Sequence, residues 1–312
     1  MIGVYIISIV ALFYFLGKAA DILVFRVRKF GERLGVRVFF LGLVLGLFTS
    51  IPEFALGINA VLSDVPAISM GNLFGGVIVL FGLILGGSAI MNRKIKTDGK
   101  LENFLPVPIY ILLGVILGFD GKFNLPEAVV LVAGYLFLIF YYFKQNHLSE
   151  ESRPVMHARD AMKNFLVLVS SLAVIILCSN LIVRLTLTLL ARFALPAFVV
   201  GLIAFSIGTN LPEIVVTIRS WKRHVRELSL ANIIGSSIAN VFIAGILALM
   251  HPVAFETGPS YFIFAFFVAA LSVLLLWFYK TGSAITKREG VVLVFIYAAF
   301  LFSEVGLFAA TP

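Results

Sequence analysis

The chain has 312 residues, of which 61% are hydrophobic and only 13% are charged. A soluble domain is nearer half apolar and a quarter charged, so this composition excludes an ordinary water-soluble globular protein. Apolar runs of about 20 residues, the length that crosses a bilayer as a helix, recur along the sequence. The formal net charge of +8 is interpreted as basic cytoplasmic loops, and no nucleic-acid partner is predicted.

Ten segments of the sequence are predicted to cross the membrane, joined by short loops. They are 2–25, 36–61, 66–91, 103–119, 125–143, 163–190, 196–219, 228–250, 260–279 and 289–308. The first segment lacks a basic start and a small-residue cleavage site, so we interpret it as a span and not as a removed signal. The fold class predicted is therefore an all-α polytopic membrane protein with about ten transmembrane helices.

The basic residues gather in alternate loops. Twenty of the 24 Lys and Arg residues lie in the loops that follow odd-numbered spans or within two residues of those loops. By the positive-inside rule these loops face the cytoplasm, so both termini are expected outside. We expect the bilayer to be the plasma (inner) membrane of a prokaryote.

Two of the predicted spans each carry a carboxylate directly after a proline, at 48–53 (Phe-Thr-Ser-Ile-Pro-Glu) and 208–213 (Gly-Thr-Asn-Leu-Pro-Glu). An ionisable residue at bilayer depth is costly and marks a functional site by default. The proline frees a carbonyl four residues back, here that of Phe48 or Gly208. A Thr hydroxyl, a freed carbonyl and the carboxylate form a hard-oxygen cage that suits Ca²⁺ or Na⁺.

The two motifs belong to an internal repeat with an offset of 160 residues (213 minus 53). At the same offset, residues 68–75 match residues 228–235 without a gap. The offset covers five spans, an odd number, so the copies cross the membrane in opposite directions. Inverted repeats are typical of secondary transporters, whose site lies at the repeat interface. The predicted five-helix repeats are 1–150, with motifs 48–53 and 71–80, and 151–312, with motifs 208–213 and 231–240.

These paired motifs resemble those of the sodium/calcium exchanger family of the cation/calcium (CaCA) antiporter superfamily. The family patterns are Gly-Thr-Ser-Leu-Pro-Glu and Gly-Asn-x-x-Gly-Ser with a polar residue four positions after the Ser. The second copy, 208–213 with 232–240, fits well, and the first, 48–53 with 71–80, fits in part. The resemblance implies Ca²⁺ for Na⁺ antiport by alternating access, with no cofactor and no enzymatic activity. The metal ligands that it implies are Glu53, Glu213, Thr49, Thr209, Ser50, Asn210, Ser236 and Asn240.

The first copy departs from the family pattern. Gly76 stands where the family has Ser, and Leu80 where it has a polar side chain, while the second copy keeps Ser236 and Asn240. Asn210 also replaces a Ser of the family motif. Sodium coupling and stoichiometry therefore remain open, and H⁺-coupled exchange of Ca²⁺ or another divalent cation is the alternative.

Two other classes of function are less well supported by the sequence. A passive channel needs a continuous polar pore, but polar residues concentrate in four of the ten predicted spans. An intramembrane enzyme needs a nucleophile–His pair or a metal motif at depth. The histidines, however, all lie in or beside predicted loops: His147, His157, His224 and His251.

Two further acidic residues fall in or near predicted spans. Asp21 is expected to pair with a nearby Arg, and Glu304 is expected at the outer interface. The single Cys178 permits no intrachain disulfide and no cysteine zinc site. The expected partners are inorganic cations and the lipid bilayer, and the oligomeric state is left open.

Overall fold

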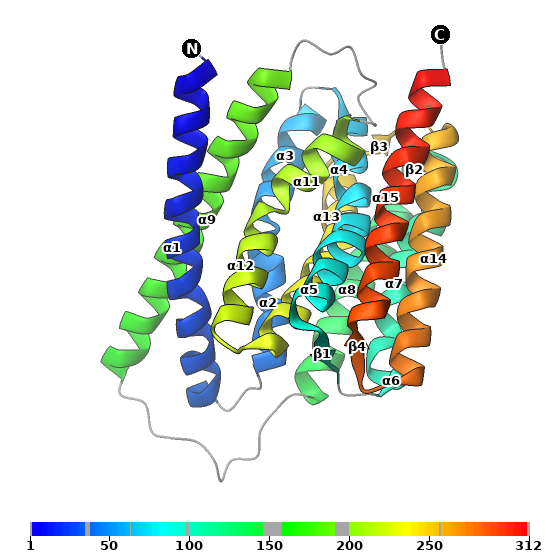
Figure 1. Ribbon diagram of the computed structural model, residues 1–312. Helices are drawn as coiled ribbons and strands as arrows, with labels where there is room; N and C mark the ends of the chain where they lie inside the picture. Colours follow the sequence, from blue (N-terminus) through cyan, green and yellow to red (C-terminus); the bar gives the residue numbers. More distant parts are fainter. Residues whose placement is uncertain are drawn as a thin grey trace.

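The structure is a computed structural model, and it describes residues 2–34, 38–62, 64–97, 100–145, 158–190, 200–255 and 257–310. Within these ranges the chain is almost entirely helical, with two small two-stranded sheets. Both ends of the described chain lie at the upper end of the molecule in Figure 1.

The helices of the two halves follow one another in a similar order. Those of the first half are α1 (Ile2–Leu34), α2 (Val38–Thr49), α3 (Ile51–Leu62), α4 (Pro66–Ile78), the π-helix η1 (Val79–Leu85), α5 (Gly86–Asn92), α6 (Leu101–Phe104), α7 (Pro106–Leu117) and α8 (Leu125–Gln145). Those of the second half are α9 (Ala158–Leu190), the π-helix η3 (Val200–Phe205), α11 (Ser206–Thr209), α12 (Leu211–Lys222), α13 (Arg226–Met250), α14 (Pro259–Thr281) and α15 (Lys287–Ala310).

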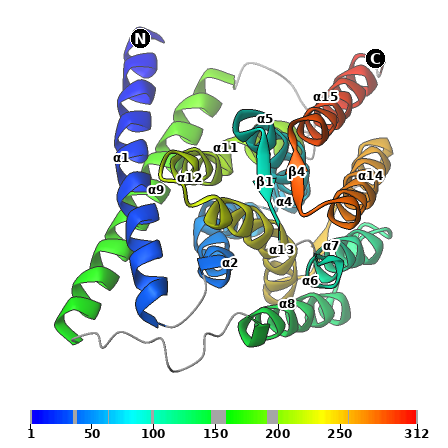
Figure 2. The same cartoon turned by 60° about the horizontal axis from the view of Figure 1, so that its bottom comes forward.

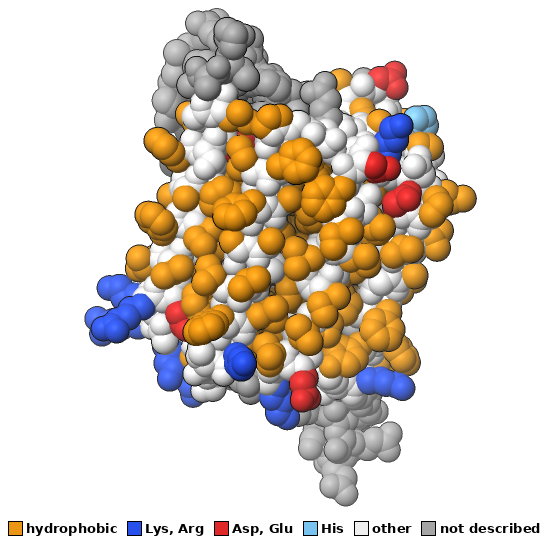
Figure 3. Space-filling view, turned by 90° about the vertical axis from the view of Figure 1, so that its right-hand side faces the viewer, with side chains coloured by type: hydrophobic (Ala, Val, Ile, Leu, Met, Phe, Trp, Pro, Cys, Tyr) orange, Lys and Arg blue, Asp and Glu red, His pale blue; other side chains and the backbone are white. Residues whose placement is uncertain are grey.

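The described helices make the chain a multi-pass membrane protein. Six of them are long and apolar enough to span a bilayer: Phe39–Leu62, Pro66–Asn92, Leu125–Gln145, Glu227–Met250, Pro259–Thr281 and Lys287–Leu307. The bent pair Gly201–Thr209 and Leu211–Lys222 makes seven if it is one span. Figure 3 shows apolar side chains across the middle of one face, with most Lys and Arg toward its lower end. The count of ten spans stays a prediction.

Two spans form the centre of the molecule. In the most apolar part of Pro66–Asn92, 83% of the residues are buried, and in that of Glu227–Met250 the share is 78%. The same share is only 28% for α8 and for α15, which therefore lie at the periphery. The two central spans carry the second motif of each predicted repeat, so these motifs lie inside the protein and not against lipid.

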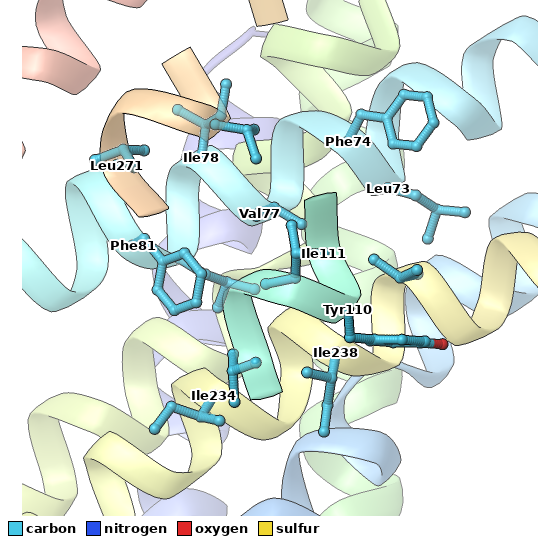
Figure 4. Close-up of a cluster of buried hydrophobic side chains, with 14 of the residues drawn as sticks. Leu73, Phe74, Val77, Ile78, Phe81, Tyr110, Ile111, Ile234, Ile238 and Leu271 are labelled. Atoms are coloured by element: carbon cyan, nitrogen blue, oxygen red, sulfur yellow. The ribbon is translucent and has the colours of Figure 1, made fainter. Parts of the chain in front are cut away.

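The largest apolar cluster surrounds the central helices. Figure 4 shows side chains of α4 and η1, among them Phe74 and Phe81, packed with residues of α7, α13 and α14. The ring of Phe74 stacks on that of Phe264 with centroids 4.8 Å apart. A separate cluster joins α1 and α9 to α12 through residues such as Leu23, Ile175 and Val216, and Figure 2 shows this helix pair at one side of the bundle.

Each proline motif interrupts its helix as the sequence predicts. The chain breaks at Ser50, between α2 and α3, and at Asn210, between α11 and α12, where the axis bends by 43°. Pro212 lies in the first turn of α12, where a proline fits because that N–H has no partner within the helix. The segments α2–α3 and α11–α12 run in opposite directions in Figure 1.

The two sheets join distant parts of the chain, which the sequence did not predict. Strand β1 (Lys94–Lys96) pairs antiparallel with β4 (Ala284–Thr286), and β2 (Lys122–Phe123) pairs antiparallel with β3 (Val253–Ala254). The first sheet lies toward the lower end of the molecule and the second toward the upper end (Figure 1). The sheets therefore tie loops of the two halves together at opposite ends of the bundle.

The two other acidic residues of the spans have different outcomes. Asp21 forms the predicted ion pair, with Oδ2 3.1 Å from Nη1 of Arg219 and Oδ1 3.6 Å from Nε of Arg223. The side chain of Glu304 is only 1% exposed, which the sequence did not predict, and its position at the outer interface stays a prediction. Glu304 lies beside Ser260 of α14. Packing against this helix therefore covers Glu304, although it is near the end of its span in the sequence.

The histidines within the described chain lie outside the helices. His224 is exposed in the turn after α12, and His251 is exposed directly after α13. His147 and His157 lie outside the described residues. The described histidines are therefore in loops, as predicted.

Candidate cation-binding site

Two carboxylates face each other's motifs at the helix breaks. Glu53 lies in the first turn of α3 and Glu213 in the first turn of α12, and both are fully buried. Glu53 lies beside Thr209 and close enough to Glu213 for their charges to interact, while Glu213 lies beside Thr49. The N-terminal turn of a helix carries a partial positive charge that favours an anionic group. The fold thus brings two motifs that are 160 residues apart (213 minus 53) to one place.

Ser236 of α13 connects the first break to the second carboxylate. Its Oγ lies 3.0 Å from Oε1 of Glu213 and 3.2 Å from the carbonyl oxygen of Gly46. It also lies 3.4 Å from Oγ1 of Thr49. A hydroxyl has one proton to donate, so it satisfies only one of these acceptors at a time. We call this group of oxygens, from Gly46, Thr49, Glu213 and Ser236, the first crossing.

Two asparagines hold the threonine hydroxyls, and the sequence analysis did not assign them to the site. Oγ1 of Thr209 donates to Oδ1 of Asn72 at 3.0 Å, and Oγ1 of Thr49 lies 3.5 Å from Oδ1 of Asn232. Both asparagines are fully buried. The match of Asn72 with Asn232 at the repeat offset was the sequence signal that could have identified them.

The amides of Asn210 and Asn240 are held by their nitrogen ends. Nδ2 of Asn210 donates to the carbonyl of Ser206 at 2.7 Å, and Nδ2 of Asn240 donates to the carbonyl of Leu73 at 3.2 Å. The Oδ1 atom of each is buried and accepts no hydrogen bond. Each amide therefore presents a free oxygen in a fixed orientation.

Several buried oxygens of these residues have no hydrogen-bond partner. They are Oε1 and Oε2 of Glu53, Oε2 of Glu213, Oδ1 of Asn210 and Oδ1 of Asn240. A buried acceptor without a partner costs free energy, and a buried carboxylate costs more. A bound cation would satisfy these atoms, and an all-oxygen set of carboxylates, amides and hydroxyls is what Ca²⁺ and Na⁺ prefer.

The eight predicted ligands are all buried, but they do not all face one another. Seven are at the breaks or on α13 as described above: Thr49, Glu53, Thr209, Asn210, Glu213, Ser236 and Asn240. Ser50 differs, because its hydroxyl donates to the carbonyl of Gly46 on its own helix at 2.9 Å. Within the described chain no three His, Cys, Asp or Glu side chains cluster as a metal site would need, so the two carboxylates carry the charge.

Of the two carbonyls predicted to be free, the structure shows that of Gly208 engaged, and it adds the carbonyl of Gly46 at the first break. The carbonyl that meets Ser50 and Ser236 belongs to Gly46 and not to Phe48. The side chain of Phe48 is 47% exposed, and the role of its carbonyl stays a prediction. The carbonyl of Gly208 was predicted to be free, but it accepts a hydrogen bond from the N–H of Asn210.

Glycines let the backbones around the site approach closely. A methyl group at Gly42 would lie 3.1 Å from the carbonyl oxygen of Leu228 and 3.3 Å from the backbone nitrogen of Asn232. One at Gly201 would collide with the carbonyl of Ile68 and lie 2.9 Å from the backbone nitrogen of Asn72. Such contacts between helices are the usual role of small residues in membrane proteins.

Comparison with known proteins identifies the family. The model of the sodium/calcium exchanger protein family matches residues 4–144 and 163–305. The chain belongs to the sodium/calcium exchanger protein family. The resemblance predicted from the motifs is confirmed, and membership places the chain among membrane transporters and not among enzymes.

Relatives of this exchanger-family chain span nearly its whole length. The sodium/calcium exchanger MaX1 of Methanosarcina acetivorans is 28% identical over an alignment 341 positions long, which covers 92% of this chain and 94% of that protein. The membrane protein MJ0091 of Methanocaldococcus jannaschii is 25% identical and covers 95% of each chain. A solved structure of the sodium-calcium exchanger NCX_Mj matches with a TM-score of 0.83 at 24% identity, over 97% of this chain and 99% of that one. This last likeness shows a shared fold.

Proposed function

We propose that the protein is a membrane antiporter that exchanges Ca²⁺ for Na⁺ by alternating access, with Glu53 and Glu213 as the central ligands. The observation that carries this proposal is the pair of fully buried carboxylates whose oxygens are mostly without hydrogen-bond partners. Two carboxylates neutralise one divalent cation, and the same oxygens can hold monovalent cations in its place. Membership of the exchanger family and the name of the relative MaX1 support the same ion pair.

The ligands of the bound cation are proposed to be the eight residues of the two breaks and α13. Glu53 and Glu213 supply the charge, and Asn210 and Asn240 add the free amide oxygens. Thr49, Thr209 and Ser236 add hydroxyls that rotate between a protein acceptor and the ion. Ser50 joins them if its hydroxyl leaves the carbonyl of Gly46.

We further propose two inverted five-helix repeats, residues 1–150 and 151–312, with ten spans. Contacts that occur twice support this. Gly42 meets Leu228 and Asn232, as Gly201 meets Ile68 and Asn72. The strand pairs β1–β4 and β2–β3 are likewise related by exchanging the two halves, and the family model matches two stretches of similar length.

The π-helix η3 accounts for an offset in this repeat. Gly42 precedes Thr49 by seven residues (49 minus 42), whereas Gly201 precedes Thr209 by eight (209 minus 201). The extra residue falls in the segment Val200–Phe205, which is π-helical. A π-helical turn accommodates an additional residue within a helix and is frequent at functional sites. The close contacts of Gly42 and Gly201 can then correspond despite the insertion.

The membrane orientation is proposed from the charges. Lys and Arg side chains gather toward one end of the face in Figure 3, and this end is assigned to the cytoplasm of a prokaryotic cell, with both termini outside. The segments α2–α3 and α11–α12 run in opposite directions in Figure 1. In this orientation one carboxylate motif becomes accessible from each side of the membrane in turn, which is the basis of alternating access in inverted-repeat transporters.

The alternative coupling ion is H⁺. The first half lacks oxygen-bearing side chains at Gly76 and at Leu80, and the side chain of Leu80 is fully buried. Two buried carboxylates can also bind protons when the cation leaves. This observation keeps H⁺-coupled exchange of Ca²⁺ or another divalent cation as the second candidate.

Ca²⁺ flux in proteoliposomes tests the proposal. Vesicles that contain the purified protein would be loaded with Na⁺, or with acidic buffer, or with neither, and ⁴⁵Ca²⁺ uptake would be followed after dilution. We expect uptake only with an outward gradient, with Na⁺ more effective than H⁺. Uptake driven by the pH gradient alone would favour the alternative, and equal uptake without any gradient would contradict antiport and indicate a channel.

A further inference from the structure

Asn210 lies where the two halves of the site differ most. Its counterpart in the first half is Ser50, since 210 minus 160 is 50. Each side chain donates to the carbonyl four residues earlier, Ser50 to Gly46 at 2.9 Å and Asn210 to Ser206 at 2.7 Å. The donor is a hydroxyl in one case and an amide –NH₂ group in the other. A hydroxyl also has acceptor lone pairs for a cation, whereas the –NH₂ group of an amide has none.

The space beside Asn210 also differs from the corresponding space at the first crossing. At the first crossing, the hydroxyl of Ser236 lies 3.2 Å from the carbonyl of Gly46 and 3.0 Å from Oε1 of Glu213. The residue that matches Ser236 is Gly76, which has no side chain. A methyl group at Gly76 would lie 3.1 Å from Nδ2 of Asn210 and would collide with Nδ2 of Asn240. Two amide nitrogens thus fill the place where a hydroxyl would stand.

We call the group formed by Ser206, Asn210 and Gly76 the second crossing. Amide –NH₂ groups of the protein itself close it. At the first crossing a carbonyl, two hydroxyls and a carboxylate oxygen meet, all of which can bind a cation. The carbonyl of Gly46 is engaged by hydroxyls, which keep lone pairs for a cation. The carbonyl of Ser206 is engaged at 2.7 Å by the –NH₂ group of Asn210, which has no lone pair to offer. The –NH₂ group carries a partial positive charge and repels a cation from this place.

We propose that the –NH₂ group of Asn210 is a tethered substitute for one monovalent cation, so that each exchange cycle uses one fewer coupling ion than two open crossings would. This inference rests on the proposed exchange function and specifies its stoichiometry. The two ends of the amide then have separate roles. Oδ1, which accepts no hydrogen bond, faces the central cation, and Nδ2 closes the second crossing.

On this proposal, a hydroxyl at position 76 alone does not open the second crossing. Gly76→Ser would push against the amides of Asn210 and Asn240, so room has to be made first. Asn210→Ser removes the blocking –NH₂ group and adds no bulk. The double variant Gly76→Ser with Asn210→Ser gives the second crossing the hydroxyls of the first. Ser50→Asn is the matched reverse change, because it places an amide at the crossing that is open.

The test is the Na⁺ dependence of Ca²⁺ exchange in proteoliposomes, fitted with a Hill coefficient for wild type, Asn210→Ser, the double variant and Ser50→Asn. We expect a higher coefficient for Asn210→Ser and the double variant, and a lower one for Ser50→Asn. If the wild type responds only to H⁺, the double variant is expected to gain Na⁺ dependence. Equilibrium binding of ²²Na⁺ to the detergent-solubilised proteins provides a second readout, with more Na⁺ bound by Asn210→Ser than by wild type.

The outcomes separate this inference from the proposed function. Wild-type Ca²⁺ flux that ignores every opposing gradient would overturn antiport itself. Wild-type exchange that is gradient-dependent, together with unchanged Hill coefficients and unchanged ²²Na⁺ binding in Asn210→Ser, would overturn the inference alone. Asn210→Ser and Ser50→Asn decide the matter if the double variant does not fold.

Discussion

At the scale of the residue, Asn72 and Asn232 extend the site beyond the ligands expected from the motifs. Each accepts or approaches a threonine hydroxyl of the opposite break through Oδ1, at 3.0 Å for Asn72 and 3.5 Å for Asn232. Asn72 shares the proton of Thr209 with the carbonyl of Phe205, also at 3.0 Å, and Asn232 shares that of Thr49 with the nearer carbonyl of Gly46, at 3.1 Å. A proton held by these acceptors leaves the lone pairs of the threonine oxygen for a cation. The asparagines therefore act by positioning Thr209 and Thr49, as outer groups do around many metal sites.

Replacing either asparagine should weaken Ca²⁺ binding without removing charge. Asn72→Leu and Asn232→Leu are each expected to raise the Ca²⁺ concentration for half-maximal flux about 10–100-fold, which is typical for loss of an outer-shell partner. Asn59→Leu is the matched control, because Asn59 is exposed and bonds only the carbonyl of Ala55 on its own helix. Similar Ca²⁺ dependence in all three variants would contradict the positioning role.

Glu304 shows that burial alone does not define the site. Its carboxylate is as inaccessible as those of Glu53 and Glu213, and neither of its oxygens accepts a hydrogen bond. It lies on α15 beside Ser260 of α14, however, and not in either of the proline motifs. A buried carboxylate without a partner costs more than a buried amide.

Glu304→Gln should therefore leave the fold at least as stable as the wild type and leave Ca²⁺ exchange intact. The expected result is an unchanged or higher midpoint of thermal unfolding in detergent, measured by tryptophan fluorescence. A loss of exchange in this variant would show that Glu304 belongs to the transport path.

At the scale of the element, close backbone contacts between helices position the site. Gly42 of α2 rests on the backbone of α13, and Gly201 of η3 rests on the backbone of α4. Backbone contacts cannot move aside as flexible side chains can, so an added methyl group has to shift a whole helix. These shifts would displace Asn232 or Asn72, whose backbone nitrogens lie at the contacts.

Adding a methyl group at either of these glycine contacts should destabilise the protein. Gly42→Ala and Gly201→Ala are each expected to lower the free energy of unfolding by about 1–3 kcal/mol and to reduce flux. Gly87→Ala is the control, because nothing lies within 4 Å of the added methyl group. Alanine at Gly87 of α5 is expected to be neutral or to stabilise by about 0.5–1 kcal/mol. Equal changes in stability at the three positions would contradict the close helix contacts as the cause.

The elements also show which features the sequence could predict. The proline three residues after a threonine in each motif predicted the interruption of both helices, because the missing N–H is a local property of Pro52 and Pro212. The burial of Glu304 could not be predicted, since it depends on where α14 packs. The same holds for the amides that fill the space at Gly76. Local chemistry was predictable, whereas contacts between distant helices were not.

At the scale of the whole molecule, the charge of the site couples transport to pH. The site carries two buried carboxylates and no buried Lys or Arg among the described residues. A proton that binds either carboxylate removes negative charge that attracts the cation, so protons compete with Ca²⁺. Acidification therefore weakens cation binding, and alkaline conditions restore it.

The expected result is a Ca²⁺ concentration for half-maximal exchange that rises as the pH falls, with the maximal rate preserved at saturating Ca²⁺. The measurement is initial ⁴⁵Ca²⁺ uptake at equal pH on both sides of the vesicle membrane, with a fixed Na⁺ gradient. An affinity independent of pH would indicate that protons do not reach Glu53 and Glu213 during the cycle.

The most direct test of the central claim compares the three buried membrane carboxylates as single Gln variants. Exchange of ⁴⁵Ca²⁺ would be measured in proteoliposomes for wild type, Glu53→Gln, Glu213→Gln and Glu304→Gln, with equal amounts of monodisperse protein. The account predicts that Glu53→Gln and Glu213→Gln abolish exchange while Glu304→Gln retains it, because only the first two hold the cation. Near wild-type exchange in Glu53→Gln or Glu213→Gln would contradict the account.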